Sequence, residues 1–257
     1  MDPHVKDRAR AWAAEAVGRL IVLFAQLLTG LRAIGFDATR HTGPTLYFAN
    51  HTSHGDFVLL WATLPPWLRA VTRPVAGEDY WMASKLRAFI GRDVFRALMI
   101  RRDGSGAGGN PVEQMAEALG NGDSLIMFPE GTRNTTEETL LPLKSGLYHL
   151  ARACPDVHLV PVWIENLKRV LPKGKLLPVP LACTLRYGPP LVLGAGEDKA
   201  DFLARARQAL LDMRPEYDRD PPPAPPSPPA PPAAAPVDAP LPALPAAAPT
   251  SSAPEVR

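Results

Sequence analysis

Cysteine is scarce in this chain, whose 257 residues include only Cys154 and Cys183. Two cysteines are too few for the disulfide framework that small secreted domains use to compensate for a limited core. Neither lies in a Cys or His pattern typical of a zinc site or a catalytic nucleophile. We therefore expect two reduced thiols, with Cys183 in an apolar strand-like run and Cys154 near a helix end.

The sequence also lacks a long uncharged apolar run. The best candidate is residues 17–31, VGRLIVLFAQLLTGL, whose uncharged core from Leu20 to Leu31 has 12 residues, whereas a transmembrane helix needs about 20. No small-residue cleavage site follows, and arginines flank the run, so a signal peptide is disfavoured. We interpret residues 1–40 as an N-terminal amphipathic, membrane-associating helical region that lies in the interface. The alternative is a helix buried on the domain core.

Net charge is only +2, but the basic residues are unevenly distributed. Between residues 69 and 102 there are eight basic and three acidic side chains. Such a segment attracts phosphates, anionic lipid headgroups or an acidic carrier, although a solvated basic face is the ordinary explanation. No aromatic stacking pattern or base-reading motif accompanies the charge, so we expect no nucleic acid partner.

Aromatic residues are absent from residues 221–257, which consist mostly of proline, alanine and other small residues. This composition cannot bury enough apolar surface to offset the entropy of ordering. We predict a disordered Pro/Ala-rich C-terminal tail over residues 216–257. An alternative is that the tail is a polyproline ligand for a partner protein.

Residues 41–215 alternate strand-like and helix-like segments. Strands are expected at residues 45–49, 70–76, 95–100, 124–128, 158–164 and 182–187, and helices at 56–64, 82–90, 112–119, 144–153 and 199–213. This alternation predicts an α/β domain with a mostly parallel or mixed central sheet flanked by helices. Chemistry in such sheets gathers at the carboxyl ends of strands. Two polar clusters, residues 50–56 and 129–133, lie at such positions.

The first cluster, NHTSHGD, admits three interpretations. His51, His54 and Asp56 have residue types that bind metals, although no other histidine or carboxylate cluster accompanies them. The segment is also suited to a purely structural capping turn. In the third interpretation, a tight turn entering a helix brings Asp56 to His51, fixes the imidazole tautomer and stabilises the imidazolium. With no clear serine or cysteine nucleophile, we favour His51 as a general base for a substrate hydroxyl.

The second cluster, FPEGTRN, follows an apolar strand-like run. Gly131 permits a close backbone approach, Thr132 offers a hydroxyl, and Arg133 is suited to bidentate phosphate binding. Glu130 is expected to orient the arginine or to contact substrate hydroxyls. A simple polar turn is the alternative for this segment alone, and its pairing with the first cluster favours a functional site.

Together these blocks resemble the membrane-associated glycerolipid acyltransferases of the 1-acylglycerol-3-phosphate acyltransferase type. Asn50, His51 and Asp56 match the family's N-H-x-x-x-x-D motif, residues 128–133 match F-P-E-G-T-R, and residues 160–162 match V-P-V. Lys144 lies in LKSG, which resembles F-K-x-G. The family's second motif corresponds to RALMIRRD, which supplies Arg101 and Arg102 but lacks the usual glycine. The resemblance extends from about Thr45 to about Tyr187.

The resemblance implies that a fatty acyl group moves from acyl-CoA or acyl carrier protein to the free hydroxyl of lysophosphatidic acid. The product would be phosphatidic acid, made in phospholipid biosynthesis. His51 would be the general base and Asp56 would orient it. The acceptor's phosphate and glycerol would be held by residues of the later motifs, namely Arg101, Arg102, Glu130, Gly131, Thr132, Arg133 and Lys144.

The same resemblance implies a thioester co-substrate, no further cofactor and no metal. It places the protein at the cytoplasmic face of the inner membrane, as a peripheral or monotopic protein in contact with its lysolipid acceptor. Three alternatives stay open: another acceptor such as a lyso-ornithine lipid or a lysophospholipid, a metal-dependent hydrolase, and a non-catalytic membrane scaffold that uses the tail.

Overall fold

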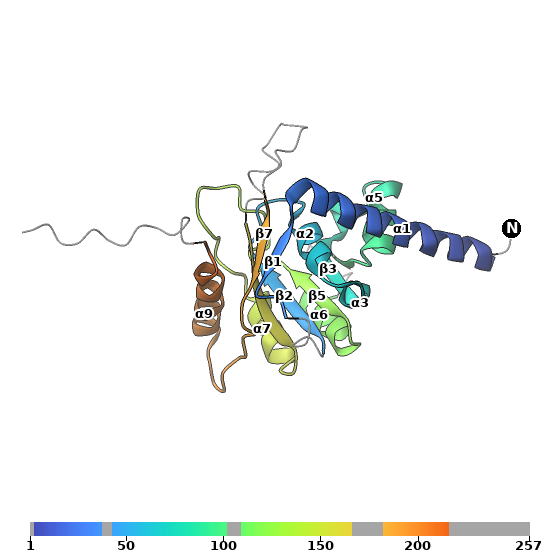
Figure 1. Ribbon diagram of the computed structural model, residues 1–257. Coiled ribbons are helices and arrows are strands. Elements are labelled where there is room, and N and C mark those ends of the chain that lie inside the picture. Colours follow the sequence, from blue (N-terminus) through green and yellow to red (C-terminus); the bar gives the residue numbers. More distant parts are fainter. Residues whose placement is uncertain (1–2, 38–42, 102–108, 166–181, 216–257) are drawn as a thin grey trace, which may run out of the picture. The chain divides into compact units, whose positions relative to one another are not determined.

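The computed structural model describes residues 3–37, 43–101, 109–165 and 182–215, which all belong to one unit, residues 1–219 (Figure 1). Its elements in chain order are α1 (Pro3–Thr29), β1 (Arg32–Ile34), β2 (Thr45–Ala49), α2 (Asp56–Thr63), α3 (Pro66–Val71), β3 (Thr72–Gly77), α4 (Glu78–Trp81), α5 (Lys85–Phe89), the π-helical turn η2 (Ile90–Val94), β4 (Leu98–Ile100), α6 (Pro111–Gly120), β5 (Ser124–Met127), α7 (Gly146–Ala153), β6 (His158–Ile164), β7 (Thr184–Tyr187) and α9 (Lys199–Asp212). The predicted tail, residues 216–257, lies outside the described residues.

One seven-stranded sheet organises the domain, in the order β1-β7-β6-β2-β5-β3-β4. The pair β6 and β7 runs antiparallel, and the other neighbouring strands run parallel. The mostly parallel or mixed sheet that the sequence predicts is therefore confirmed. Because β2, β5, β3, β4 and β6 run in one direction, their carboxyl ends lie along one edge of the sheet.

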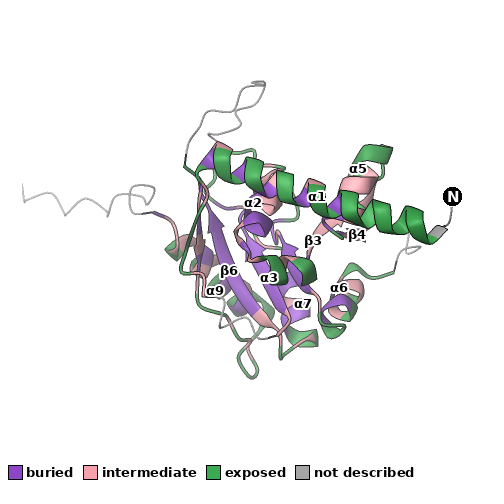
Figure 2. Cartoon of the chain, turned by 45° about the vertical axis from the view of Figure 1, so that its right-hand side comes forward, coloured by how far each residue is buried: buried purple, intermediate pink, exposed green. Residues whose placement is uncertain are grey.

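Strand β2 is buried along its whole length at the centre of the sheet. Tyr47 and Ala49 belong to the apolar cluster that includes residues of α1, α2 and α3. Leu46 and Phe48 belong to the opposite cluster, formed with α6, α7 and α9 (Figure 2). A strand covered on both faces needs apolar side chains at every position, which explains the uninterrupted run TLYFA.

Helix α1 has 27 residues, lies within the helical region expected over residues 1–40, and begins well before the apolar run at residues 17–31. An 18-residue window within residues 4–29 has a mean hydropathy of 1.5, so the helix is long and apolar enough to cross a membrane by length and composition alone. The helix continues through Arg19 because that side chain pairs with Glu15 one turn earlier, at 2.6 Å between Nη2 and Oε1. The expectation that the apolar segment is too short to span is therefore corrected.

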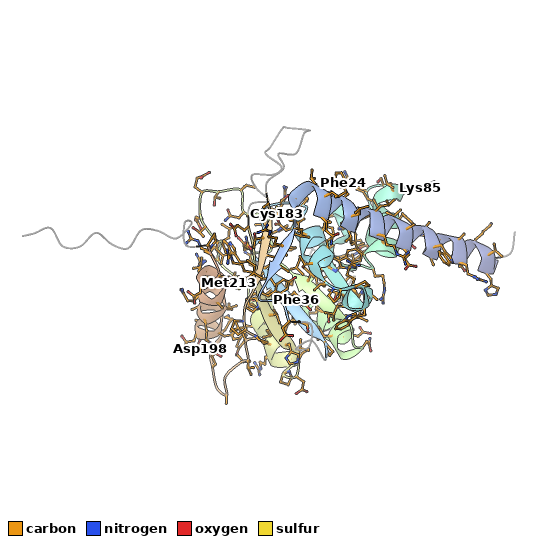
Figure 3. All side chains as sticks on the ribbon, viewed as in Figure 1. Phe24, Phe36, Lys85, Cys183, Asp198 and Met213 are labelled. Atoms are coloured by element: carbon orange, nitrogen blue, oxygen red, sulfur yellow. The ribbon has the colours of Figure 1, made fainter. Side chains whose placement is uncertain are left out.

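The two faces of α1 differ in side-chain size. The face toward the domain is buried and carries small or β-branched residues, namely Ala14, Gly18, Val22, Ala25 and Thr29. The outward face exposes large apolar residues, namely Trp12, Leu20, Leu23, Phe24 and Leu27, and Figure 3 shows Phe24 on this outer side. Water is a poor solvent for such a face, so α1 has the polarity of an element that contacts a membrane or another apolar surface.

Strand β1 is not predicted by the sequence pattern, because it has three residues and all of them are exposed. It pairs in parallel with β7 at the edge of the sheet, with Ala33 opposite Leu185. The predicted N-terminal region, residues 1–40, thus contributes a strand to the central sheet. A domain boundary at residue 40 would separate this strand from its partner.

Both cysteines are free thiols. Cys183, just before β7, is fully buried, and its burial raises the pKa of its thiol to about 11. Cys154 is half-buried at the end of α7, and burial raises the pKa of its thiol as well. A raised thiol pKa lowers the thiolate fraction at neutral pH, so neither cysteine has the character of a nucleophile.

Candidate active site

The two polar clusters meet because β2 and β5 are neighbours and run parallel. The loop after β2 contains His51, and the loop after β5 contains Glu130. The backbone N–H of His51 donates to Glu130 Oε1 at 2.6 Å, and the N–H of Asn134 donates to the carbonyl oxygen of His51 at 2.6 Å. The sheet therefore brings together two segments that are about 80 residues apart in sequence.

Asp56 is the first residue of α2, and it holds the His51 ring. His51 Nδ1 lies 2.9 Å from Asp56 Oδ2, and the same oxygen accepts the backbone N–H groups of Thr52 at 2.6 Å and Ser53 at 2.8 Å. The Asp56 side chain is fully buried and that of His51 is 18% exposed. The predicted juxtaposition of these two residues is confirmed, because the turn from 52 to 55 folds the helix start back onto the imidazole.

Asp56 Oδ2 lies at the start of a helix, where several hydrogen bonds hold it. Three donors converge on Oδ2, and the N-terminus of a helix stabilises negative charge. A carboxylate facing Nδ1 keeps the proton on that nitrogen, which leaves Nε2 with a lone pair. The ring is also stacked on Phe128, with 4.1 Å between ring centroids and 15° between planes. The imidazole is thus oriented on two sides and presents one basic nitrogen.

Glu130 is buried, and its carboxylate joins the two loops. Oε1 accepts from the His51 backbone and Oε2 accepts from the N–H of Leu141 at 2.9 Å. Burial raises the pKa of Glu130 above its ordinary value, and the two backbone hydrogen bonds oppose that rise. Both oxygens are engaged by the protein itself, which favours a positioning role over the predicted contact with substrate.

The remaining residues of the second cluster lie around this edge. Gly131 has φ +71°, and a Cβ there would lie 3.2 Å from Lys144 Cγ, so the turn requires glycine. Thr132 and Lys144 are exposed, and Arg133 is half-buried. The positive charge of Arg133 is one cause, after burial, of the lowered pKa of His54, so Arg133 and His54 lie near each other. Within the described residues, the side chains of Arg133 and Lys144 make no ion pair.

The two arginines of the second motif are placed differently. Arg101 follows β4, and its Nε lies 2.7 Å from Glu78 Oε2, so its guanidinium already has a carboxylate partner. Arg102 lies outside the described residues. Their predicted contacts with substrate stay predictions.

The metal interpretation finds no ligand set in the structure. Among the described residues, no group of three or more histidine, cysteine, aspartate or glutamate side chains is arranged to hold a metal ion. His54 stacks instead on Tyr80, with ring centroids 5.2 Å apart, and Arg87 lies 4.7 Å from the centre of the same Tyr80 ring.

Asn50 is a residue whose role sequence reasoning missed, although it begins the first motif. Its side chain is buried, and it bonds to both backbone groups of Ile164 at the end of β6. Asn50 Nδ2 donates to the Ile164 carbonyl at 3.0 Å, and the Ile164 N–H donates to Oδ1 at 2.7 Å. The amide thereby holds the start of the His51 loop against β6. Its place at the start of the N-H-x-x-x-x-D motif is the signal that the sequence offers for this role.

We expect Asn50→Ala to lower the free energy of unfolding by about 2 to 4 kcal/mol, because it leaves two buried backbone groups of Ile164 without partners. Thermal and urea unfolding measure this loss. Asn121→Ala, at an exposed helix end, is the matched control and is expected to change stability little. Equal stability of the two variants would contradict the bridging role.

The curated proteins that this chain resembles include 1-acyl-sn-glycerol-3-phosphate acyltransferases of plants. A 1-acyl-sn-glycerol-3-phosphate acyltransferase of Cocos nucifera is 25% identical over 196 residues, which cover 74% of this chain and 58% of that protein. One of Limnanthes douglasii is 28% identical over 198 residues, covering 74% and 63%. The chain thus spans about six-tenths of the length of these curated relatives.

A solved structure has the same fold. The crystal structure of the 1-acyl-sn-glycerophosphate (LPA) acyltransferase, PlsC, of Thermotoga maritima matches with a TM-score of 0.61 and 18% identity. The match covers 81% of this chain and 83% of that one. At this identity the likeness shows the fold alone.

The family comparison agrees with the motifs. The sequence model of the Acyltransferase family matches residues 31–165, which include both polar clusters. The resemblance seen in the sequence is confirmed by this match. Since the matched segment is more than half of the 257 residues, the chain belongs to the Acyltransferase family.

Proposed function

We propose that this protein transfers a fatty acyl group from acyl-CoA or acyl carrier protein to the free hydroxyl of lysophosphatidic acid, giving phosphatidic acid. The observation that carries the proposal is the His51–Asp56 pair, with 2.9 Å between Nδ1 and Oδ2 and a basic Nε2 left for substrate. The names of the curated relatives and of the structural match support lysophosphatidic acid as the acceptor.

The chemistry requires one base and no covalent enzyme intermediate. His51 Nε2 removes the proton of the acceptor hydroxyl as that oxygen attacks the thioester carbonyl carbon. The C–S bond then breaks, and the imidazolium returns its proton to the leaving thiolate. Asp56 stabilises the imidazolium during the two proton transfers, because its charge faces Nδ1. His51 and Asp56 provide the groups for these steps, and the steps call for no further cofactor or metal.

The acceptor phosphate is proposed to bind Arg133 and Lys144. Both belong to the loop between β5 and α7, and neither side chain makes an ion pair within the described part of the chain. A phosphate needs such uncommitted cations, and arginine binds it through two parallel hydrogen bonds. Thr132 adds an exposed hydroxyl in the same loop. Glu130 takes part by positioning the His51 backbone rather than by touching the acceptor.

An acceptor and donor panel tests this function. Purified protein receives labelled acyl-CoA or acyl carrier protein with lysophosphatidic acid, lyso-ornithine lipid and other lysophospholipids, with and without EDTA. We expect transfer to lysophosphatidic acid, unchanged by EDTA. Exclusive use of another lysolipid would replace the acceptor while keeping the mechanism, and chelator-sensitive hydrolysis in place of transfer would contradict the proposal.

Helix α1 is proposed to bring the enzyme to its lipid acceptor at the cytoplasmic face of the membrane, by burying its outward apolar face. We expect Leu27→Ser to weaken binding to vesicles about ten- to hundredfold, since burying a leucine side chain in apolar surroundings contributes about 1.5 to 3 kcal/mol. Vesicle flotation measures the partition. Val192→Ser is the matched control: Val192 is 71% exposed and Leu27 is 77% exposed, but Val192 lies outside α1. Equal flotation of both variants with wild type would show that α1 is not the anchor.

A further inference from the structure

A groove lies between α1 and the elements it covers, α3, η2 and the carboxyl end of α2. Its volume is about 790 Å³. Figure 2 shows α1 lying across α2, with α3 below α1 in the view. The residues that line the groove include none from the two polar clusters. On α2, the lining residue Trp61 lies five residues after Asp56, which separates the two by about 7.5 Å along the helix axis. The groove is therefore a separate feature from the catalytic edge.

The floor of the groove is apolar. From α1 it takes Ala14, Gly18 and Val22, whose small size leaves the space open. Trp61 and Phe95 contribute from below, with their ring centroids 5.1 Å apart. A cavity of this size and polarity accepts the hydrocarbon part of a ligand.

The rim of the groove is basic, with five arginines against three carboxylates. Arg10 pairs with Asp93, at 2.7 Å between Nε and Oδ1, and Arg19 pairs with Glu15. The Arg96 side chain donates to the carbonyl of Ala70 and lies 3.7 Å from an oxygen of Asp123. The two remaining arginines, Arg69 and Arg92, make no ion pair with any described residue.

Arg69 is the more informative of these two. It is half-buried, and its guanidinium lies 5.4 Å from the centre of the Trp61 ring. Burial lowers the pKa of Arg69, which means that the folded chain removes water from this cation without supplying an anion. Removing water from a cation without supplying an anion costs stability, and an anionic ligand in the groove would compensate Arg69.

We propose that this groove binds an acidic amphiphile, an anionic membrane phospholipid whose phosphate contacts Arg69 and Arg92 and whose hydrocarbon lies under α1. Charge complementarity selects the anion, and the apolar floor selects an amphiphile over free phosphate. The outward face of α1 exposes Leu20, Leu23, Phe24 and Leu27 on the same helix, so the ligand would come from the membrane in which that face is buried. Such a site would make docking depend on lipid charge, independently of the acyl transfer reaction.

Binding of short-chain lipids to the full chain in a non-ionic detergent tests the proposal by calorimetry, without any activity readout. The probes are dihexanoyl phosphatidylserine, dihexanoyl phosphatidylcholine and inorganic phosphate. Both lipids carry a phosphate, but only the serine lipid has a net negative charge, because the choline ammonium cancels the phosphate charge. Wild type is therefore expected to bind the serine lipid about tenfold more tightly than the choline lipid, and to bind inorganic phosphate more weakly than either amphiphile. Arg69→Gln is expected to remove this preference, and Arg69→Lys to retain part of it.

Two further variants separate the groove from general electrostatics. Arg152→Gln removes an exposed positive charge on α7, across the sheet from α1, and is expected to bind like wild type. Ala11→Trp adds volume in the groove without changing charge, and is expected to weaken binding of both lipids. Thermal unfolding confirms that each variant is folded. The proposal is overturned if wild type does not discriminate the two lipids, or if Arg69→Gln binds phosphatidylserine as tightly as wild type does.

A final arm identifies the source of the phosphate. Short-chain lysophosphatidic acid is compared with phosphatidylserine in wild type and Arg69→Gln. A loss confined to phosphatidylserine shows that the groove takes bulk anionic phospholipid, as proposed. A loss of both shows that it takes phosphate amphiphiles generally, including the proposed acceptor, and keeps the site. Since the readout is binding, failure of this proposal leaves the acyl transfer mechanism untouched, and failure of acyl transfer leaves the groove testable.

Discussion

His51→Ala is expected to lower kcat for acyl transfer by about 10² to 10⁴-fold, the range that a positioned general base contributes. The substitution removes Nε2, the basic nitrogen that faces substrate, and leaves the Asp56 carboxylate without its imidazole partner. KM for the lysolipid is expected to change little, because the proposed acceptor contacts come from Arg133 and Lys144. Loss in kcat with KM retained marks a group that acts in the transition state.

Steady-state kinetics with labelled acyl donor measures this effect, and circular dichroism shows that the variant is folded. His149→Ala is the control for loss of a histidine, since His149 is exposed on α7 and outside both polar clusters. His54→Ala separates the base from a metal ligand, because a ligand set of His51, His54 and Asp56 would require both histidines. Full activity of His51→Ala would exclude the general-base mechanism.

The second large effect is expected for Asp56→Asn, a loss in kcat of about 10² to 10⁴-fold, as found when a triad carboxylate becomes an amide. The amide oxygen can occupy the position of Oδ2 and accept from Thr52 and Ser53 as the carboxylate does. The amide nitrogen then takes the place of Oδ1, which is buried and has no hydrogen-bond partner within the described residues. The hydrogen bonds to Thr52 and Ser53 are therefore retained while the negative charge beside the imidazole is lost, and the buried amide donors lower stability by about 1 to 3 kcal/mol.

This variant isolates the charge from the geometry. Asp56→Asn is compared with Asp156→Asn, which removes an exposed carboxylate from a turn outside the site. A large difference in kcat between the two variants, both of them folded at the assay temperature, would show that the carboxylate stabilises the imidazolium. A threefold loss of kcat corresponds to a rise of less than about 1 kcal/mol in the activation free energy. If Asp56→Asn stays within about threefold of wild type, the turn positions His51 and the charge contributes little.

Much of the fold follows from local patterns in the sequence. TLYFA and SLIMF are short apolar runs with turn residues after them, and both form buried strands. Asn110 and Pro111 predict the start of α6, and the Asn110 side chain does accept from the N–H of Val112 at 2.9 Å. The His51–Asp56 contact is also local, because the turn and the first residue of a helix are enough to close it.

Local sequence patterns do not predict the short helices and strands. Strand β1 has three exposed residues, and α3 and α4 have six and four. Elements of this length have too few residues to show the periodicity of apolar residues that marks a helix or a strand.

The sequence by itself determined the alternation of strands and helices, the two polar clusters and the base with its carboxylate, because these depend on residues within one turn or one strand. The tertiary structure decided which strands are neighbours. Only that order places Glu130 on the backbone of His51 and Asn50 on Ile164, 79 and 114 residues apart. It also turns large apolar side chains of α1 outward and leaves Arg69 over Trp61 with no acidic partner among the described residues. The periodicity of apolar residues specifies which face of a helix or strand is buried. The element that packs against that face depends on the order of strands in the sheet, which no local pattern encodes.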